Sequence, residues 1–160
     1  LYELMKKKTY QNIYKILESL FSSNPPLSFQ AKMSLTASVL ASKFENWIFC
    51  GFYVSCNDKY LEIGPYYGKI LPCTSIKYGN GVCGTSALNK QTITVKDILK
   101  YENYISCDSD TKSEIVVPIF NEDKLVAVLD IDSNKRNDFN KTDEQNLEKI
   151  STLFFKKNQK

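Results

Sequence analysis

Three of the five cysteines lie where a thiol could do chemistry. Cys107 lies in a polar loop, residues 105–112, that leads into the predicted strand of Glu114, and it is the cysteine that we expect to be most exposed. Its thiolate would be a nucleophile, provided that Lys112, backbone N–H groups or a helix terminus lowers its pKa. Cys73 and Cys83 lie on loops or element ends, and either could resolve an oxidised Cys107 if the Cα atoms came within about 4.4–6.8 Å. The sequence spacing alone does not choose between them.

Acidic residues gather at one end of a hairpin predicted for residues 113–133. A turn in the middle of this stretch places Glu114 opposite Ile131 or Asp132 in antiparallel pairing. Asp130 and Asp132 are two residues apart and therefore share one face of their strand. Carboxylates in such a cluster repel one another, and burial raises their pKa values. The cluster therefore destabilises the fold unless a cation or a bound proton reduces the repulsion between the carboxylates.

Three interpretations of this acidic cluster are open. The acids could mark only a solvated strand end. They could form a pocket for an ammonium group, with one carboxyl of raised pKa acting as a proton donor. They could also bind a divalent ion through their oxygens, but neither a calcium-loop spacing nor a phosphate loop supports this.

The composition excludes several classes of function. The 160 residues include no histidine, which removes Ser-His-Asp catalysis, Cys-His catalysis and histidine-ligated zinc. There is no CxxC motif, so we expect no structural zinc. The net charge is only +3 and Arg136 is the single arginine, which is not the balance of a nucleic-acid-binding protein. The remaining groups for chemistry are carboxylates, lysines, tyrosines and cysteines.

The sequence also bears on location. An odd number of cysteines, in a chain large enough to need no disulfide framework, indicates a reducing compartment. No run has the length of a membrane span, and no signal-peptide pattern is present. We therefore expect a cytoplasmic protein that does not bind a membrane, although the sequence begins at Leu1 and leaves an earlier leader open.

The elements that must position these residues follow from periodicity. A single domain over 1–160 is predicted, with N-terminal helices within 8–44, a sheet with active-site loops over 47–133, and a C-terminal helix over 142–157. The first helix is expected to stop at Asn24-Pro25-Pro26, and Thr142 with Gln145 has the spacing of a capping box. Apolar runs predict the strands Ile48–Ser55, Tyr60–Gly64, Lys69–Cys73, Thr92–Val95, Glu114–Phe120 and Leu125–Asp132.

Between these runs, a glycine-rich turn at 78–87 is expected to feed a short helix. About five or six mostly antiparallel strands with flanking helices define an α+β fold class. The second N-terminal helix is expected to span 28–44.

Six short motifs then stand in order along the chain: Gly64-Pro-Tyr-Tyr-Gly-Lys69, Pro72-Cys73, Gly79-Asn-Gly-Val-Cys-Gly-Thr85, Cys107-Asp-Ser109, Ser113-Glu-Ile-Val-Val-Pro118 and Leu129-Asp-Ile-Asp-Ser133. With cysteine spacings of ten and twenty-four, the sequence resembles the free methionine-R-sulfoxide reductases, which are single GAF domains. The resemblance runs from about residue 14 to 155. It implies six antiparallel strands flanked by helices, enclosing a small pocket.

The resemblance also implies a reaction, the reduction of free L-methionine-(R)-sulfoxide. The cysteine matching Cys107 attacks the sulfoxide sulfur, the one matching Cys73 captures the resulting sulfenic acid, and thioredoxin reduces the disulfide. The cysteine matching Cys83 is an alternative resolving thiol. Such chemistry needs two thiols and an acid, and no metal or organic cofactor. Related enzymes are often dimers, so a homodimer is a further expectation.

The same resemblance implies a substrate pocket lined by acids matching Glu114, Asp130 and Asp132. The family usually reads Trp-x-Gly-Phe-Tyr, in which the tryptophan and tyrosine contact the substrate methyl group. Tyr53 and Trp47 are the matching residues here, but two additional residues separate them. Strict spacing would put Phe49 where the tryptophan belongs, whereas a small bulge would keep Trp47 in place.

Two other classes of function compete with the enzyme. A non-catalytic GAF sensor would bind a small molecule without turnover, and a structural domain would keep its cysteines buried and unreactive. The three-cysteine pattern, together with the acidic cluster, favours the enzyme.

Overall fold

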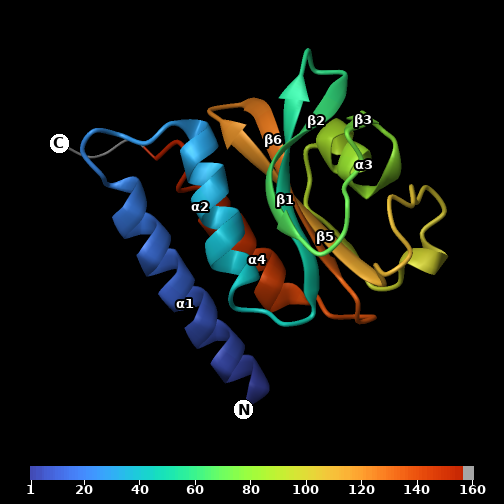
Figure 1. The fold of residues 1–160 in the computed structure, drawn as a ribbon, viewed down its shortest axis with the longest axis horizontal. Coiled ribbons are helices and arrows are strands. Elements are labelled where there is room, and N and C mark those ends of the chain that lie inside the picture. Colours follow the sequence, from blue (N-terminus) through green and yellow to red (C-terminus); the bar gives the residue numbers. More distant parts are fainter. Residues whose placement is uncertain (157–160) are drawn as a thin grey trace.

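The computed structural model describes residues 1–156 and is built in three layers (Figure 1). Its helices are α1 (Tyr2–Phe21), α2 (Phe29–Ala41), α3 (Gly81–Asn89), the 3-10 turn η1 (Ile98–Lys100) and α4 (Lys141–Ser151). Its strands are β1 (Trp47–Cys56), β2 (Tyr60–Gly68), β3 (Ser75–Lys77), β4 (Ile93–Val95), β5 (Ser113–Asn121) and β6 (Lys124–Ser133). Within the described residues these strands form one six-stranded antiparallel sheet, in the order β3-β2-β1-β6-β5-β4. This confirms the predicted α+β class.

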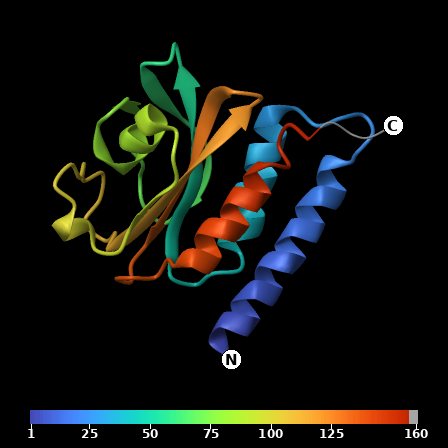
Figure 2. The same ribbon diagram turned by 180° about the vertical axis from the view of Figure 1, so that it is seen from behind.

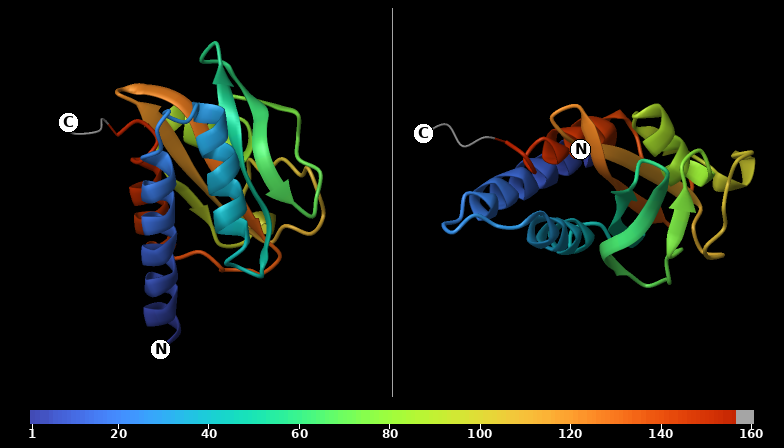
Figure 3. Two further views of the ribbon diagram at one scale, coloured as in Figure 1. Left: turned by 60° about the vertical axis from the view of Figure 1, so that its left-hand side comes forward. Right: turned by 90° about the horizontal axis from the view of Figure 1, so that it is seen from above.

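The two faces of the sheet have different covers. The long helices α1, α2 and α4 lie on one side, with α1 and α4 running side by side (Figure 2), while α3, η1 and their loops lie on the other (Figure 3). The helix side buries a large apolar cluster that includes Tyr10, Leu17, Leu40, Phe52, Ile131, Leu147 and Phe154. The opposite side buries Phe49, Tyr53, Leu61, Val82, Val116 and Val128. None of the helices within residues 1–156 has the length and apolarity needed to span a membrane.

The first helix is longer than the sequence predicts, because it begins at Tyr2 and not near residue 8. Its additional turn is held by Lys6, whose ammonium donates to Asp143 Oδ2 at 2.5 Å. The Tyr10 hydroxyl donates to the other oxygen of Asp143 at 2.7 Å. A lysine at a buried position interrupts the apolar periodicity, which is why the pattern hides this turn.

The ends of the other two long helices also differ from expectation. The second helix ends at Ala41 and not at 44, since Phe44 turns back to stack on Trp47 with ring centroids 4.0 Å apart. The last helix ends at Ser151, so the predicted helix 142–157 is too long, and its final residue lies outside the described residues. Its capping box also uses other residues: Asn140 is the N-cap and Asp143 the reciprocal partner.

One predicted strand is wrong. Residues 69–73 form a loop, and the strand that pairs with β2 is instead β3, where Leu61 lies opposite Ile76. Pro72 has no N–H group to donate to a ladder, which disfavours a strand through this segment. The loop is free to cover the face of the sheet opposite the long helices.

The buried ion pair between α1 and α4 gives a direct test of the packing. Lys6→Ala is expected to lower the free energy of unfolding by about 3–5 kcal/mol, because the buried Asp143 carboxylate loses its charge partner. Urea denaturation followed by circular dichroism measures this change. Lys7→Ala, at an exposed position of the same helix, is the control and should stay within about 0.5 kcal/mol of wild type. Equal stability of the two variants would contradict a structural role for the pair.

Candidate active site

The acidic cluster is assembled by the β5–β6 hairpin. A two-residue turn at Glu122 and Asp123 sets the register, in which Glu114 lies opposite Asp132, one of the two predicted pairings. Asp130 lies two residues before Asp132 and therefore faces the same side of the sheet. All three carboxyl groups line one cavity, and none is more than 8% exposed. The interpretation as a solvated strand end is therefore wrong.

Burial changes the acidity of these groups. Burial, followed by the charges of Asp130 and Asp132, raises the pKa of Glu114 well above its usual range. Burial and the charge of Asp130 do the same to the pKa of Asp132. Burial also raises the pKa of Asp130, to about 6, where hydrogen bonds with Glu114 and Cys83 limit the rise. Of the three acids, Asp130 therefore gives up its proton most readily, while Glu114 and Asp132 hold theirs more tightly.

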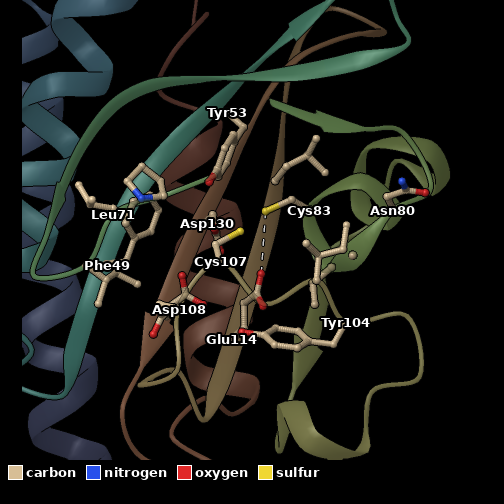
Figure 4. Close-up of a pocket in the computed structure, with 17 residues that line it drawn as sticks. Phe49, Tyr53, Leu71, Asn80, Cys83, Tyr104, Cys107, Asp108, Glu114 and Asp130 are labelled. Carbon is tan, nitrogen blue, oxygen red and sulfur yellow. Dashed lines mark hydrogen bonds between the residues drawn. The ribbon is translucent and has the colours of Figure 1, made fainter. Parts of the chain in front are cut away.

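The glycine-rich turn brings Cys83 to these acids. Gly79 and Gly81 have φ values of +87° and +62°, in the left-handed region that glycine tolerates best. A Cβ at Gly84 would overlap the backbone oxygen of Lys77, so only glycine lets the start of α3 approach β3 this closely. As a result, Cys83 Sγ lies 3.9 Å from Glu114 Oε1 (Figure 4). Burial and the nearby carboxylates raise the pKa of this thiol well above its usual range.

The other two candidate cysteines are joined to each other. Cys73 and Cys107 form a disulfide with Cα atoms 5.5 Å apart, whereas Cys83 is free and buried. Of the two resolving partners that the spacing left open, the structure pairs Cys73 with Cys107. Cys107 is exposed, as predicted, in the loop before β5. Of the remaining two cysteines, Cys50 is buried and Cys56 is partly exposed.

Asp108 shapes the loop that holds Cys107. Its Oδ1 accepts hydrogen bonds from the backbone N–H groups of Asp110 and Thr111, and its Oδ2 accepts one from the Thr111 hydroxyl. These three bonds fix the backbone directly after the cysteine. Lys112 is exposed and does not line the cavity, so its expected help to the thiolate is absent from this arrangement.

Aromatic side chains complete the wall of the cavity, with one correction. Tyr53 lines it as predicted, but Trp47 packs in the apolar cluster on the opposite face, between Phe44 and Phe139. The β1–β6 register shifts between Trp47 and Phe49, so a bulge is present, yet it does not turn the tryptophan toward the cavity. Phe49 takes that place, as strict spacing indicates, and stacks on Tyr66 with ring centroids 5.5 Å apart.

The residues of the wall that sequence reasoning missed include Tyr104 and Asp108. Of these two, only Asp108 could have been found from the sequence, because it directly follows Cys107 in the motif Cys107-Asp-Ser109. The cavity is small, about 40 Å³. Within it, single atoms of Cys83, Glu114 and Asp130 all lie within 4.8 Å of one another, close enough to share a metal ion.

The chain has recognisable relatives. The model of the GAF domain family matches residues 36–154. The free methionine-R-sulfoxide reductase of Escherichia coli is 32% identical over 91% of this chain and 86% of its own length. The protein of that name from Saccharomyces cerevisiae is 45% identical over 69% of this chain and 62% of its own length.

Solved structures agree with these sequence matches. The X-ray structure of free methionine-R-sulfoxide reductase from Neisseria meningitidis, in complex with its substrate, superposes with a TM-score of 0.88. It covers 94% of this chain and 88% of that one, at 32% identity. The fold and the cavity thus define a GAF domain. The chain belongs to the free methionine-R-sulfoxide reductase group of the GAF family.

The buried acids predict a pH-dependent stability. The pKa of Asp130 is raised on folding, so this carboxyl destabilises the fold progressively as the pH rises from about 4 through 6. Asp130→Asn should therefore gain stability relative to wild type over this range, on the order of 2–3 kcal/mol by pH 7. Urea denaturation at several pH values measures the difference. Asp110→Asn, at an exposed position, should show no such trend, and a pH-independent difference for Asp130→Asn would contradict the raised pKa.

Proposed function

We propose that this protein reduces free L-methionine-(R)-sulfoxide to L-methionine with its own thiols. One observation supports this most strongly. Cys107 lines a cavity together with three buried carboxyl groups, and Cys73 is joined to Cys107 by a disulfide at the edge of that cavity. A sulfoxide reduction needs a nucleophilic thiol, a proton donor and a second thiol. Membership of the reductase group supports the same assignment.

The charge of the cavity favours a substrate with a free ammonium group. Its lining residues include Asp108, Glu114, Asp130 and Asp132 but neither lysine nor arginine. Ionised Asp130 is the natural partner of the ammonium, which would also satisfy its buried oxygen Oδ1. A methionine sulfoxide within a polypeptide has no such charge, so the pocket discriminates against it.

The opposite side of the cavity suits the rest of the substrate. Phe49 and Tyr53 offer an apolar surface to the methyl group. Burial raises the pKa of Tyr53, so its hydroxyl stays neutral and can donate a hydrogen bond. Trp47 has no part in this proposal, since it lies on the far face of the sheet.

In the first chemical step, the Cys107 thiolate attacks the sulfoxide sulfur. A protonated carboxyl, Glu114 or Asp132, gives a proton to the sulfoxide oxygen, and its raised pKa keeps that proton available at neutral pH. Methionine leaves, and the oxygen passes to Cys107 as a sulfenic acid. The substrate sulfur is reduced by two electrons, and the cysteine sulfur is oxidised by two.

The second step forms the disulfide. The Cys73 thiol attacks the sulfenic sulfur of Cys107, and water leaves with the oxygen. The raised pKa of Cys83 keeps its thiol protonated and favours Cys73 as the resolving residue, with Cys83 as the alternative. A thioredoxin dithiol then returns both cysteines to thiols. Thioredoxin as the reductant, a homodimer and a cytoplasmic location all stay predictions.

Cysteine variants test the assignment of the two thiols. Cys107→Ser is expected to reduce methionine release to background, because the attacking sulfur is gone. Cys73→Ser should release one methionine per chain in the absence of reductant and retain a sulfenic acid on Cys107. Quantified methionine release and mass spectrometry of dimedone-treated protein measure both outcomes.

Cys56→Ser is the matched control, because this partly exposed cysteine lies outside the cavity and should leave turnover unchanged. Undiminished turnover in Cys107→Ser would reject this residue as the nucleophile. Multiple turnovers by Cys73→Ser at the wild-type rate would show that another thiol resolves.

A further inference from the structure

One carboxylate oxygen in the cavity lacks a partner. Asp130 is 5% exposed, and its Oδ1 accepts no hydrogen bond from any group within residues 1–156. A buried oxygen of an ionised carboxylate is strongly destabilising when nothing compensates it. It therefore points to a cationic ligand at this position.

Two further ligand atoms lie beside this oxygen. Cys83 extends from the start of α3 and Glu114 from β5, and their Sγ and Oε1 atoms are 3.9 Å apart. Single atoms of Cys83, Glu114 and Asp130 lie within 4.8 Å of one another, and all three residues are buried. A tetrahedral zinc site with bonds of about 2.0–2.3 Å separates its ligands by roughly 3.3–3.8 Å. Side-chain shifts of about 1 Å would bring the three atoms to that geometry.

The ligand types select among metals. Mg²⁺ and Ca²⁺ prefer oxygen ligands, whereas a thiolate favours softer ions such as Zn²⁺ and Cd²⁺. Three protein ligands leave a fourth position open to the cavity. Cys83 is not part of the disulfide, so the sulfur is available in the oxidised protein as well.

We infer that Cys83, Glu114 and Asp130 form a binding site for a thiophilic divalent cation of the Zn²⁺ class. The ion displaces the protons of the Cys83 thiol and the Glu114 carboxyl, with no change of oxidation state: one S–H and one O–H bond break, one metal–sulfur and two metal–oxygen bonds form, and two H⁺ go to solvent. The ion uses Asp130, proposed above to hold the substrate ammonium, and Glu114, one of the two proposed proton donors, so metal and substrate exclude each other. The sequence leaves a divalent ion open for the acidic cluster, but it does not point to Cys83 as a ligand, because no CxxC or histidine pattern is present.

Cd²⁺ is a suitable probe, because its thiolate complexes absorb in the ultraviolet. The oxidised protein, with Cys73 and Cys107 joined, is titrated with Cd²⁺ without substrate or reductant. We expect the charge-transfer band to saturate at one ion per chain and to vanish in Cys83→Ser. Asp130→Asn, which keeps the sulfur, is expected to bind Cd²⁺ about tenfold more weakly or worse. Circular dichroism spectra of the variants establish that each is folded.

Cys56→Ser provides the matched control. Cys56 Sγ lies 3.8 Å from Glu62 Oε2 outside the cavity, so it is the competing place for a thiophilic ion, and its loss should leave the band unchanged. The site is rejected if wild type gives no band, if the band persists in Cys83→Ser, or if Asp130→Asn binds as tightly as wild type. Since no turnover is measured, this result is independent of the proposed reductase activity.

Discussion

The burial of three carboxyl groups at one end of the β5–β6 hairpin is the constraint on which the site depends. The antiparallel register places Glu114 directly opposite Asp132. Side chains two residues apart on a strand point to the same face, so Asp130 joins them there. Like charges this close cannot all ionise away from water, so their pKa values rise. The proposed reaction uses both consequences: an anionic carboxylate for the substrate ammonium and a protonated carboxyl for the sulfoxide oxygen.

The rest of the domain makes that unfavourable burial tolerable. The helix layer, on the face of the sheet opposite the cavity, supplies a large apolar cluster and the Lys6–Asp143 ion pair. These interactions stabilise the domain without involving the candidate active site. The cavity side, in contrast, is covered by short elements and loops. Its glycine turn places Cys83, while the Asp108 hydrogen bonds shape the loop of Cys107. Cys73 and Cys107 therefore lie on loops, whereas Cys83 is buried in α3.

The hairpin could be predicted almost completely from the sequence, because a short turn and strand alternation fix its register locally. The pairing of Cys73 with Cys107 follows from the family resemblance but not from the spacing, since it depends on how two loops fold over the sheet. The prediction of Trp47 is wrong although strict spacing indicates Phe49, because it relied on a bulge to turn the tryptophan toward the cavity. The bulge that is present leaves Trp47 packed between Phe44 and Phe139, and only packing on both faces of the strand decides this. The start of α1 was missed for a similar reason: its buried lysine makes sense only once α4 lies beside it.

Turnover with stereochemically resolved substrates tests the central claim most directly. NADPH oxidation coupled through thioredoxin reductase and thioredoxin is measured with the R and S epimers of free L-methionine sulfoxide, and with an N-acetylated, amide-capped R compound. The account predicts turnover with the free R epimer alone, because the buried carboxylates require the ammonium group. Comparable turnover of the capped compound would contradict the role of the carboxylates. No turnover with any of the three, from protein with reduced thiols, would contradict the reductase assignment and favour a non-catalytic GAF sensor.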